Sequence, residues 1–231
     1  MQPSAKAEER AGLDIAVGGE TVTLDGRGVA WLPGHGALLA ADLHLEKGSR
    51  LATMRRPAPR LDTHDTLMRL AACVRDYRPA LVVCLGDSFH DGGAGERLSP
   101  EDAAVMRRLC ASVPRWVWIT GNHDPNPPEC AGGEAADSLR LGALTLTHVP
   151  TTIDAPHVAG HLHPKATVSV RRQKITGRCF VSDGRLLVMP AFGAFAGGLS
   201  WKDEAFAAIY PRSAPECYMM FQEKLFRLPV L

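Results

Sequence analysis

Five short apolar runs in this chain end in residues that can bind a metal ion, and this repetition limits the possible folds more than any other feature. The runs cover residues 36–41, 80–85, 116–119, 144–148 and 157–161. At or just beyond their ends lie Asp42, His44, Asp87, Asn122, His123, His148, His161 and His163. Short apolar runs predict buried strands, and sites in layered α/β folds gather at the carboxyl ends of strands. We therefore expect these side chains to meet in one pocket.

The residue types in this set favour a centre with two metal ions. Apart from His123, the set offers seven nitrogen or oxygen ligands and no thiolate, which is too many for one four-coordinate zinc ion. Such a set suits two divalent ions that share a carboxylate and act together on an in-line phosphoryl displacement. Imidazole combined with carboxylate and amide oxygens favours manganese, iron, cobalt or zinc over magnesium or calcium.

Each of these signals is weak by itself, and their order along the chain gives them weight. The stretch Gly121-Asn122-His123-Asp124 alone is typical of a polar turn after a strand. A structural role does not account for five successive runs that each deliver Asp, Asn or His. The histidines outside these motifs are expected at the surface or in packing: His35, His64 and His157.

The first half of the chain alternates predicted strands and helices, whereas the second half is mostly strand. Helical spacing predicts a helix over 61–77. Ser99, followed by a proline and two acids, predicts a capped helix that runs to about residue 112. Hairpins are expected at 21–31 and 179–189, a loop or short irregular helix at 125–137, and two strands within 217–228. The pattern indicates an α/β domain with two packed sheets.

Length and composition predict one soluble domain. A chain of 231 residues can bury a large core, and we expect a single domain over 1–231 with a flexible segment at 1–12. The net charge of +1 excludes a global basic field for nucleic acid. Six scattered cysteines are typical of reduced thiols in a cytoplasmic protein. We expect neither a signal peptide nor a membrane span.

The ordered motifs resemble those of the calcineurin-like metallophosphoesterase superfamily: Asp42-x-His44, Gly86-Asp87, Gly121-Asn122-His123-Asp124, His148 and Gly160-His161-x-His163. The resemblance implies a four-layer α/β/β/α sandwich in which helices flank two packed mixed sheets. It implies that one metal ion is held by Asp42, His44, Asp87 and His163. The other ion would be held by Asp87, Asn122, His148 and His161, with Asp87 bridging. By the same resemblance, His123 assists the leaving group without binding metal, and Asp124 orients it.

The residues around these motifs narrow the resemblance further. The stretches 40–48, 84–91, 160–164 and 190–195 are similar to the bacterial ligase-associated DNA damage response endonuclease family. That family implies a manganese-dependent phosphodiesterase and DNA endonuclease associated with a DNA ligase, a helicase and an exonuclease. One departure from the wider superfamily is His90-Asp91, where many members have Asp-Arg. The missing arginine disfavours a phosphoprotein substrate, and His90 is expected either to support the site or to contact the substrate.

Two cationic clusters could bind the backbone of DNA. The segment 165–178 contains no acid, and its Lys and Arg residues are Lys165, Arg171, Arg172, Lys174 and Arg178. A second cluster consists of Arg55, Arg56 and Arg60. A solvated loop or strand face is the simpler interpretation of the first cluster, but beside a phosphodiester site these side chains become expected phosphate contacts. Because no aromatic ladder accompanies them, recognition of DNA is expected to be independent of sequence.

Two other functions are compatible with parts of the pattern. A phosphodiesterase acting on cyclic or sugar nucleotides would need the same metal ligands, so the motifs leave it open. A binding scaffold that has lost catalysis predicts eroded ligands, and none is eroded here. The apolar stretch 191–199 and the C-terminal strands could form a homodimer surface.

Overall fold

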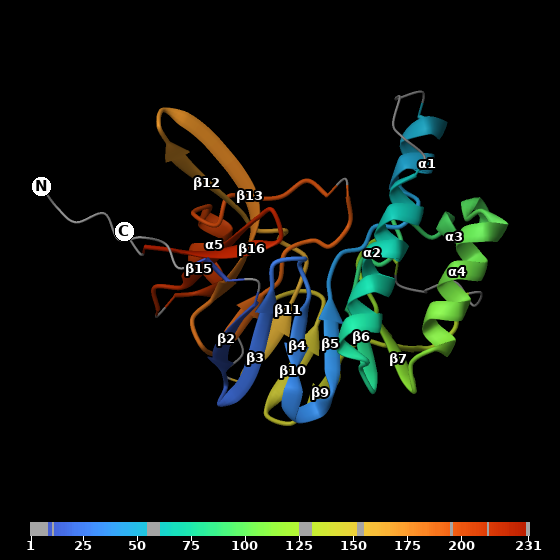
Figure 1. Cartoon of the computed structure of the whole chain (residues 1–231), viewed down its shortest axis with the longest axis horizontal. Coiled ribbons are helices and arrows are strands. Elements are labelled where there is room, and N and C mark those ends of the chain that lie inside the picture. Colours follow the sequence, from blue (N-terminus) through green and yellow to red (C-terminus); the bar gives the residue numbers. More distant parts are fainter. Residues whose placement is uncertain are drawn as a thin grey trace, which may run out of the picture.

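Two mixed β-sheets pack face to face in the middle of the molecule (Figure 1). The computed structural model of the chain describes residues 9–10, 12–54, 61–124, 131–151, 155–194, 196–211 and 213–229. Buried side chains from both sheets, such as Val83 and Phe180, form one apolar core between them. Burial on both faces explains why the central strands are continuous apolar runs rather than alternating ones.

The first sheet has seven strands in the order β2-β3-β4-β5-β6-β7-β8. The strands are β2 (Gly12–Val17), β3 (Glu20–Asp25), β4 (Ala30–Leu32), β5 (Ala37–Ala40), β6 (Leu81–Leu85), β7 (Arg115–Ile119) and β8 (Glu134–Ala136). Pairing is antiparallel from β2 to β5 and parallel from β5 to β8. The carboxyl ends of β5, β6 and β7 therefore lie side by side at one edge.

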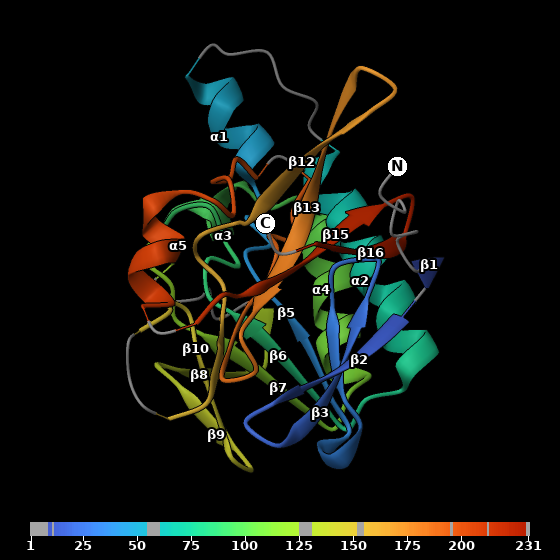
Figure 2. The ribbon, with the colours of Figure 1, turned by 90° about the vertical axis from the view of Figure 1, so that its left-hand side faces the viewer.

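The second sheet has nine strands, with β1-β16-β15-β13-β14-β11-β10-β9 in order and β12 paired to β13. The strands are β1 (Glu9–Arg10), β9 (Leu139–Leu141), β10 (Leu144–Thr147), β11 (His157–Ala159), β12 (Lys165–Val170), β13 (Gln173–Ser182), β14 (Leu186–Val188), β15 (Glu216–Phe221) and β16 (Lys224–Leu228). Strands β10 and β11 are parallel neighbours. The β12–β13 hairpin projects from the body of the molecule (Figure 2).

Helices cover the outer faces of both sheets. They are α1 (Lys47–Thr53), α2 (Asp62–Tyr77), α3 (Ala94–Arg97), α4 (Pro100–Ala111) and α5 (Glu204–Ile209), with a 3-10 turn at Pro33–His35. Helix α2 buries Leu67 and Leu70 against the seven-stranded sheet, and Phe206 of α5 packs on the other sheet. The Ser99 hydroxyl accepts a hydrogen bond from the Asp102 amide and caps α4 as expected.

These layers confirm the predicted α/β/β/α sandwich of two packed mixed sheets. None of the helices in the described ranges is long and apolar enough to cross a membrane. The five cysteines that the structure describes are buried free thiols, and Cys130 lies outside the described residues.

Of three local expectations, one was wrong in part and two stay predictions. Within the segment 1–12, Glu9–Arg10 pair with β16 and Gly12 begins β2, while residues 1–8 and 11 lie outside the described residues. The loop expected at 125–137 contains strand β8 at its end, and 125–130 are not described. The dimer surface expected at 191–199 stays a prediction: Ala191 and Phe192 are buried inside this chain, whereas Leu199 is exposed.

Candidate metal centre

The predicted ligands gather where the carboxyl ends of the two sheets meet. Four come from the loops after β5, β6 and β7, and the other three lie just beyond the ends of β10 and β11. Hydrogen bonds link the sheets at this edge: the His161 amide donates to Asp42 Oδ2 at 2.9 Å. His148 Nδ1 lies 3.0 Å from the carbonyl oxygen of Leu85 on β6. One pocket edge thus collects side chains that are more than 100 residues apart in the chain.

Asp42, His44 and His163 form a first group of potential ligands, and the atoms that could bind a metal ion lie within 4.8 Å of one another. The Nε2 atoms of His44 and His163 are 3.3 Å apart, and Asp42 Oδ1 lies 3.2 Å from His163 Nε2. Asp42 is fully buried, and its Oδ1 atom accepts no hydrogen bond from the part of the chain that is described. A buried carboxylate oxygen without a donor fits a cation ligand.

Asp87, His148 and His161 form a second group with the same spacing. His148 Nδ1 faces a carbonyl oxygen and must carry a hydrogen, so Nε2 is the nitrogen left for a metal ion. That Nε2 lies 2.9 Å from Asn122 Oδ1, 3.2 Å from His161 Nδ1 and 3.3 Å from Asp87 Oδ1. Atoms that accept hydrogen bonds therefore crowd together around one point, and a cation at that point resolves the conflict.

Electrostatics in the two groups follows the same logic. Burial lowers the pKa of His44 to about 3, helped by the nearby His163, so the His44 imidazole is neutral and offers a lone pair. Burial also lowers the pKa of His161. For Asp87, burial would raise the pKa, but the hydrogen bonds from His148 and from the His123 amide outweigh it and lower the pKa. The Asp87 carboxylate is thus ionised, and His44 and His161 are neutral, as metal ligands must be. For His148, burial would lower the pKa, but the hydrogen bond with Asp87 and the nearby Asp42 carboxylate outweigh it and raise the pKa.

Five of the seven predicted ligands have a left-handed backbone. Their φ angles are 52° at Asp42, 46° at His44, 47° at Asp87, 72° at His161 and 46° at His163. For a residue with a side chain this conformation costs about 1–2 kcal/mol, and such strain persists where the surrounding structure enforces it. The enforcing contacts include hydrogen bonds from the Asp42 amide to the Gly86 carbonyl and from the His44 amide to the Asp87 carbonyl. Five of the eleven non-glycine residues with positive φ in the described ranges are thus predicted ligands.

Gly86 is needed for a second reason. It has φ of 74°, and a Cβ atom there would lie 2.4 Å from the His148 ring. We expect Gly86→Ala to lower the free energy of unfolding of the metal-free protein by about 2 kcal/mol or more, because the ring must move or the backbone must shift. Gly19→Ala is the matched control, since Gly19 has φ of 85° and nothing within 4 Å of the added carbon. Urea unfolding of both variants measures the difference; equal losses would contradict this packing argument.

His123 lies beside the second group and contacts His90. His123 Nδ1 is 2.9 Å from the His90 carbonyl oxygen, and the two rings stack with centroids 5.3 Å apart. The expected pairing with Asp124 is not formed: this carboxylate accepts hydrogen bonds from the amides of Gly121 and Phe89. Burial raises the pKa of Asp124 to about 6. Asp124 therefore fixes the turn that carries Asn122 and His123.

The predicted substrate contacts separate into two places. His90 lies at the metal centre, where its ring also meets that of His44 edge-on. Lys165 and Arg178 line a cavity at the base of the β12–β13 hairpin, whereas Arg171 and Arg172 lie at its exposed tip.

The second predicted cationic cluster is not among the described residues, and the sequence did not predict one cation of the cavity. Arg55, Arg56 and Arg60 lie outside the described residues. Arg69 of α2 lines the same cavity as Arg178 and was not predicted. A lone arginine in an amphipathic helix gives no pattern by which it could have been found.

Comparisons with known proteins agree with this geometry. Residues 37–165 match the family model of the calcineurin-like phosphoesterases. The crystal structure of nuclease MPE from Pseudomonas putida is similar over 94% of this chain and 100% of that chain, with 28% sequence identity and a TM-score of 0.74. Yfce, a phosphoesterase from E. coli, has 11% identity and a TM-score of 0.39 over 84% of this chain and 99% of that chain. None of the curated proteins matches the chain. The family model covers the strand ends that deliver the ligands, and the chain belongs to the calcineurin-like phosphoesterase family.

Proposed function

We propose that the protein is a two-metal phosphodiesterase that hydrolyses DNA. The observation that carries the proposal is the pair of ligand groups, in which imidazole nitrogens and carboxylate and amide oxygens converge on two points. Asp42, His44 and His163 would hold one ion, and Asn122, His148 and His161 the other. Asp87 would be shared by both. Two divalent ions in such a site supply charge stabilisation for an in-line displacement at phosphorus.

The residues of the chain supply positioning and a proton donor. Because its Nδ1 faces the His90 carbonyl, the His123 ring presents Nε2 toward the site, 4.0 Å from Asp87 Oδ2. The His123 side chain is 42% exposed, so a substrate can reach it. From this position Nε2 can donate a hydrogen bond or a proton to the leaving oxygen of the phosphodiester. The turn held by Asp124 and the stacked His90 ring keep the imidazole in place.

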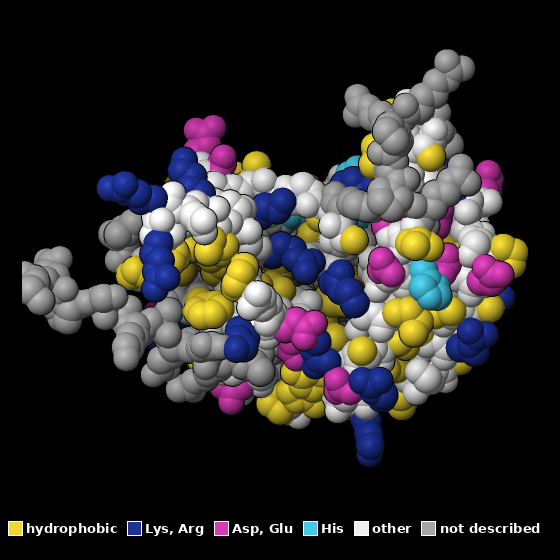
Figure 3. Space-filling model, turned by 45° about the horizontal axis from the view of Figure 1, so that its top comes forward, with side chains coloured by type: hydrophobic (Ala, Val, Ile, Leu, Met, Phe, Trp, Pro, Cys, Tyr) yellow, Lys and Arg dark blue, Asp and Glu magenta, His cyan; other side chains and the backbone are white. Residues whose placement is uncertain are grey.

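Nucleic acid is the favoured substrate because the full-length similarity is to a nuclease. The chain's own cations support this, since Lys and Arg side chains gather across the middle of the face that Figure 3 shows. The bacterial ligase-associated DNA repair family, to which the flanking motifs point, would make manganese the natural metal and a DNA ligase, helicase and exonuclease its associates. We expect the protein to act in the cytoplasm.

Metal-dependent cleavage of DNA tests the proposal. We expect manganese to support cleavage of at least one of three substrates: supercoiled plasmid, linear duplex and single-stranded oligonucleotide. We expect slower turnover, or none, with a cyclic nucleotide or a nucleotide sugar. Chelation with EDTA should abolish cleavage and manganese should restore it. Efficient hydrolysis of the small nucleotide without DNA cleavage would support the small-molecule phosphodiesterase in its place. A protein that holds no metal and hydrolyses neither would support the non-catalytic scaffold.

A further inference from the structure

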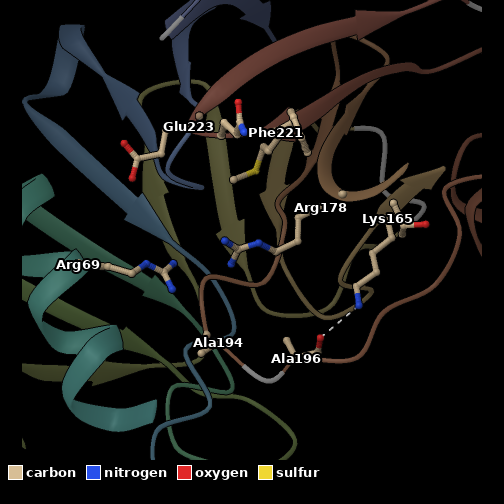
Figure 4. Close-up of a pocket in the computed structure, with 13 residues that line it drawn as sticks. Arg69, Lys165, Arg178, Ala194, Ala196, Phe221 and Glu223 are labelled. Carbon is tan, nitrogen blue, oxygen red and sulfur yellow. Dashed lines mark hydrogen bonds between the residues drawn. The ribbon is translucent and has the colours of Figure 1, made fainter. Parts of the chain in front are cut away.

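A cationic cavity of about 530 Å³ lies at the base of the β12–β13 hairpin, beside the metal centre but separate from it (Figure 4). Three cations line it: Arg69 from α2, Lys165 from β12 and Arg178 from β13. In the close-up the two guanidinium groups point toward each other across the cavity. Among the lining residues Glu223 is the one acid. The cavity therefore has a strong excess of positive charge.

The arginines are held in place without a carboxylate partner. Arg69 Nη2 donates to the carbonyl of Phe192 at 2.7 Å, and the guanidinium lies 4.4 Å from the centre of that residue's ring. Arg178 Nη1 donates to the carbonyls of Ala191 and Phe192. Within the described ranges, neither arginine forms an ion pair. A guanidinium has five N–H donors, so several donors of each remain for a ligand.

Two half-buried cations facing each other are unfavourable without an anion. Burial lowers the pKa of Arg178 to about 10, with a further contribution from Arg69, and burial also lowers the pKa of Arg69. One or two N–H donors of each arginine form hydrogen bonds that support segment 191–192. This structural role does not require both guanidinium charges to face one cavity. An anion with several oxygens would satisfy the remaining donors and relieve the repulsion.

The cavity is adjacent to the metal centre along the chain. Lys165 follows the ligand His163 by two residues, so their Cα atoms are at most about 7 Å apart. Gly193, which also lines the cavity, donates its amide to the Asp42 carbonyl. The cavity is therefore within reach of a neighbouring phosphate on a strand whose scissile phosphate lies at the metal centre.

We propose that this cavity binds a non-scissile phosphate group of the nucleic-acid strand that is cut at the metal centre. This inference rests on the proposed function and extends it: the cavity would favour polymers over phosphodiesters that carry a single phosphate. Arg69, Lys165 and Arg178 would donate to the phosphate oxygens, and Glu223 would oppose its binding. Recognition would be independent of base sequence, because only the phosphate is contacted.

Charge changes at the cavity wall test the proposal and leave intact the hydrogen bonds that the two arginines donate to the carbonyls of residues 191 and 192. Thr176 lines the cavity from β13 and is exposed. We expect Thr176→Glu to raise KM for a single-stranded oligothymidylate about fivefold, the effect of one unfavourable charge in a partly exposed site. Thr21→Glu is the matched control, since Thr21 is an exposed strand threonine that does not line the cavity. Glu223→Gln should lower KM by a similar factor.

A substrate with one phosphate separates the cavity from the metal centre. Hydrolysis of bis-p-nitrophenyl phosphate should be the same in all three variants and the parent. Binding of a fluorescent oligothymidylate in EDTA should have a salt slope that is lower by about 0.7 for Thr176→Glu, which is the value for one lost phosphate contact on a single strand. Circular dichroism melts check that each variant is folded.

Several results would overturn the proposal. One is an equal KM for oligothymidylate in Thr176→Glu and Thr21→Glu, together with no gain in Glu223→Gln. Another concerns inhibition by inorganic phosphate. If Thr176→Glu weakened this inhibition but left KM for the oligonucleotide unchanged, the cavity would bind free phosphate and no nucleic-acid strand. A parent protein that hydrolyses neither substrate would instead refute the proposed function, and the binding measurement in EDTA would still test the cavity.

Discussion

Replacing Asp87 with alanine is expected to abolish manganese-dependent phosphodiester hydrolysis, with a loss of about a thousandfold or more. The carboxylate lies 3.3 Å from His148 Nε2 and accepts the His123 amide at 2.9 Å. Its removal takes away the ligand that both ions would share. Electrostatic stabilisation by metal ions contributes several kcal/mol to such reactions, and each 1.36 kcal/mol is about a factor of ten in rate.

Metal content distinguishes this cause from misfolding. The parent should bind two manganese ions per chain and Asp87→Ala fewer than two, measured by titration followed by elemental analysis. Asp65→Ala, at an exposed site on α2, is the control and should keep both ions and full activity. If Asp87→Ala retained two ions and its hydrolysis rate, Asp87 would not be the shared ligand.

Replacing His123 with alanine is expected to leave metal binding intact and to slow hydrolysis of DNA by about 100- to 10,000-fold, the usual contribution of general acid catalysis. The reason is geometric. His123 Nε2 faces the site, but His123 belongs to neither group of ligand atoms that lie within 4.8 Å of one another. Its Nδ1 atom is already hydrogen-bonded to the His90 carbonyl. An alkoxide is a poor leaving group and needs a proton, whereas nitrophenolate does not.

The same variant should therefore lose far less activity on bis-p-nitrophenyl phosphate than on DNA. His64→Ala is the matched control, because His64 is an exposed histidine paired with Asp102 on the outer helices. Loss of bound manganese in His123→Ala would make His123 a ligand. Equal rate losses on both substrates would show that it does not protonate the leaving oxygen.

Much of the candidate site could be predicted because its signal is local. Each ligand follows an apolar run, and apolar runs with glycine at their ends predict buried strands without knowledge of their neighbours. The hairpin turn at Asp183-Gly184 and the cap at Ser99 are local in the same way, and both are present. The weaker predictions concerned segments whose structure depends on distant partners. Strand β8 is short, and its place is set by pairing with β7.

Two contacts at the centre show where local signals end. Proximity along the chain suggested that Asp124 orients His123, but the folded turn points the Asp124 carboxylate at the amides of Gly121 and Phe89. The His90 carbonyl, 33 residues away, holds the imidazole instead. Likewise, Arg69 and Arg178 face each other only because α2 and the β12–β13 hairpin meet over segment 191–192.

The sequence by itself determined which residue types reach the ends of the central strands, and hence the family and the chemistry of the ligands. The tertiary structure decided how those residues are grouped, which imidazole nitrogen is left free, and where the second cationic cavity lies. The physical reason is that strand formation follows from local burial and spacing, whereas left-handed backbone at Asp42 or His163 is locally unfavourable. Only the packing of two sheets against each other holds such residues in place.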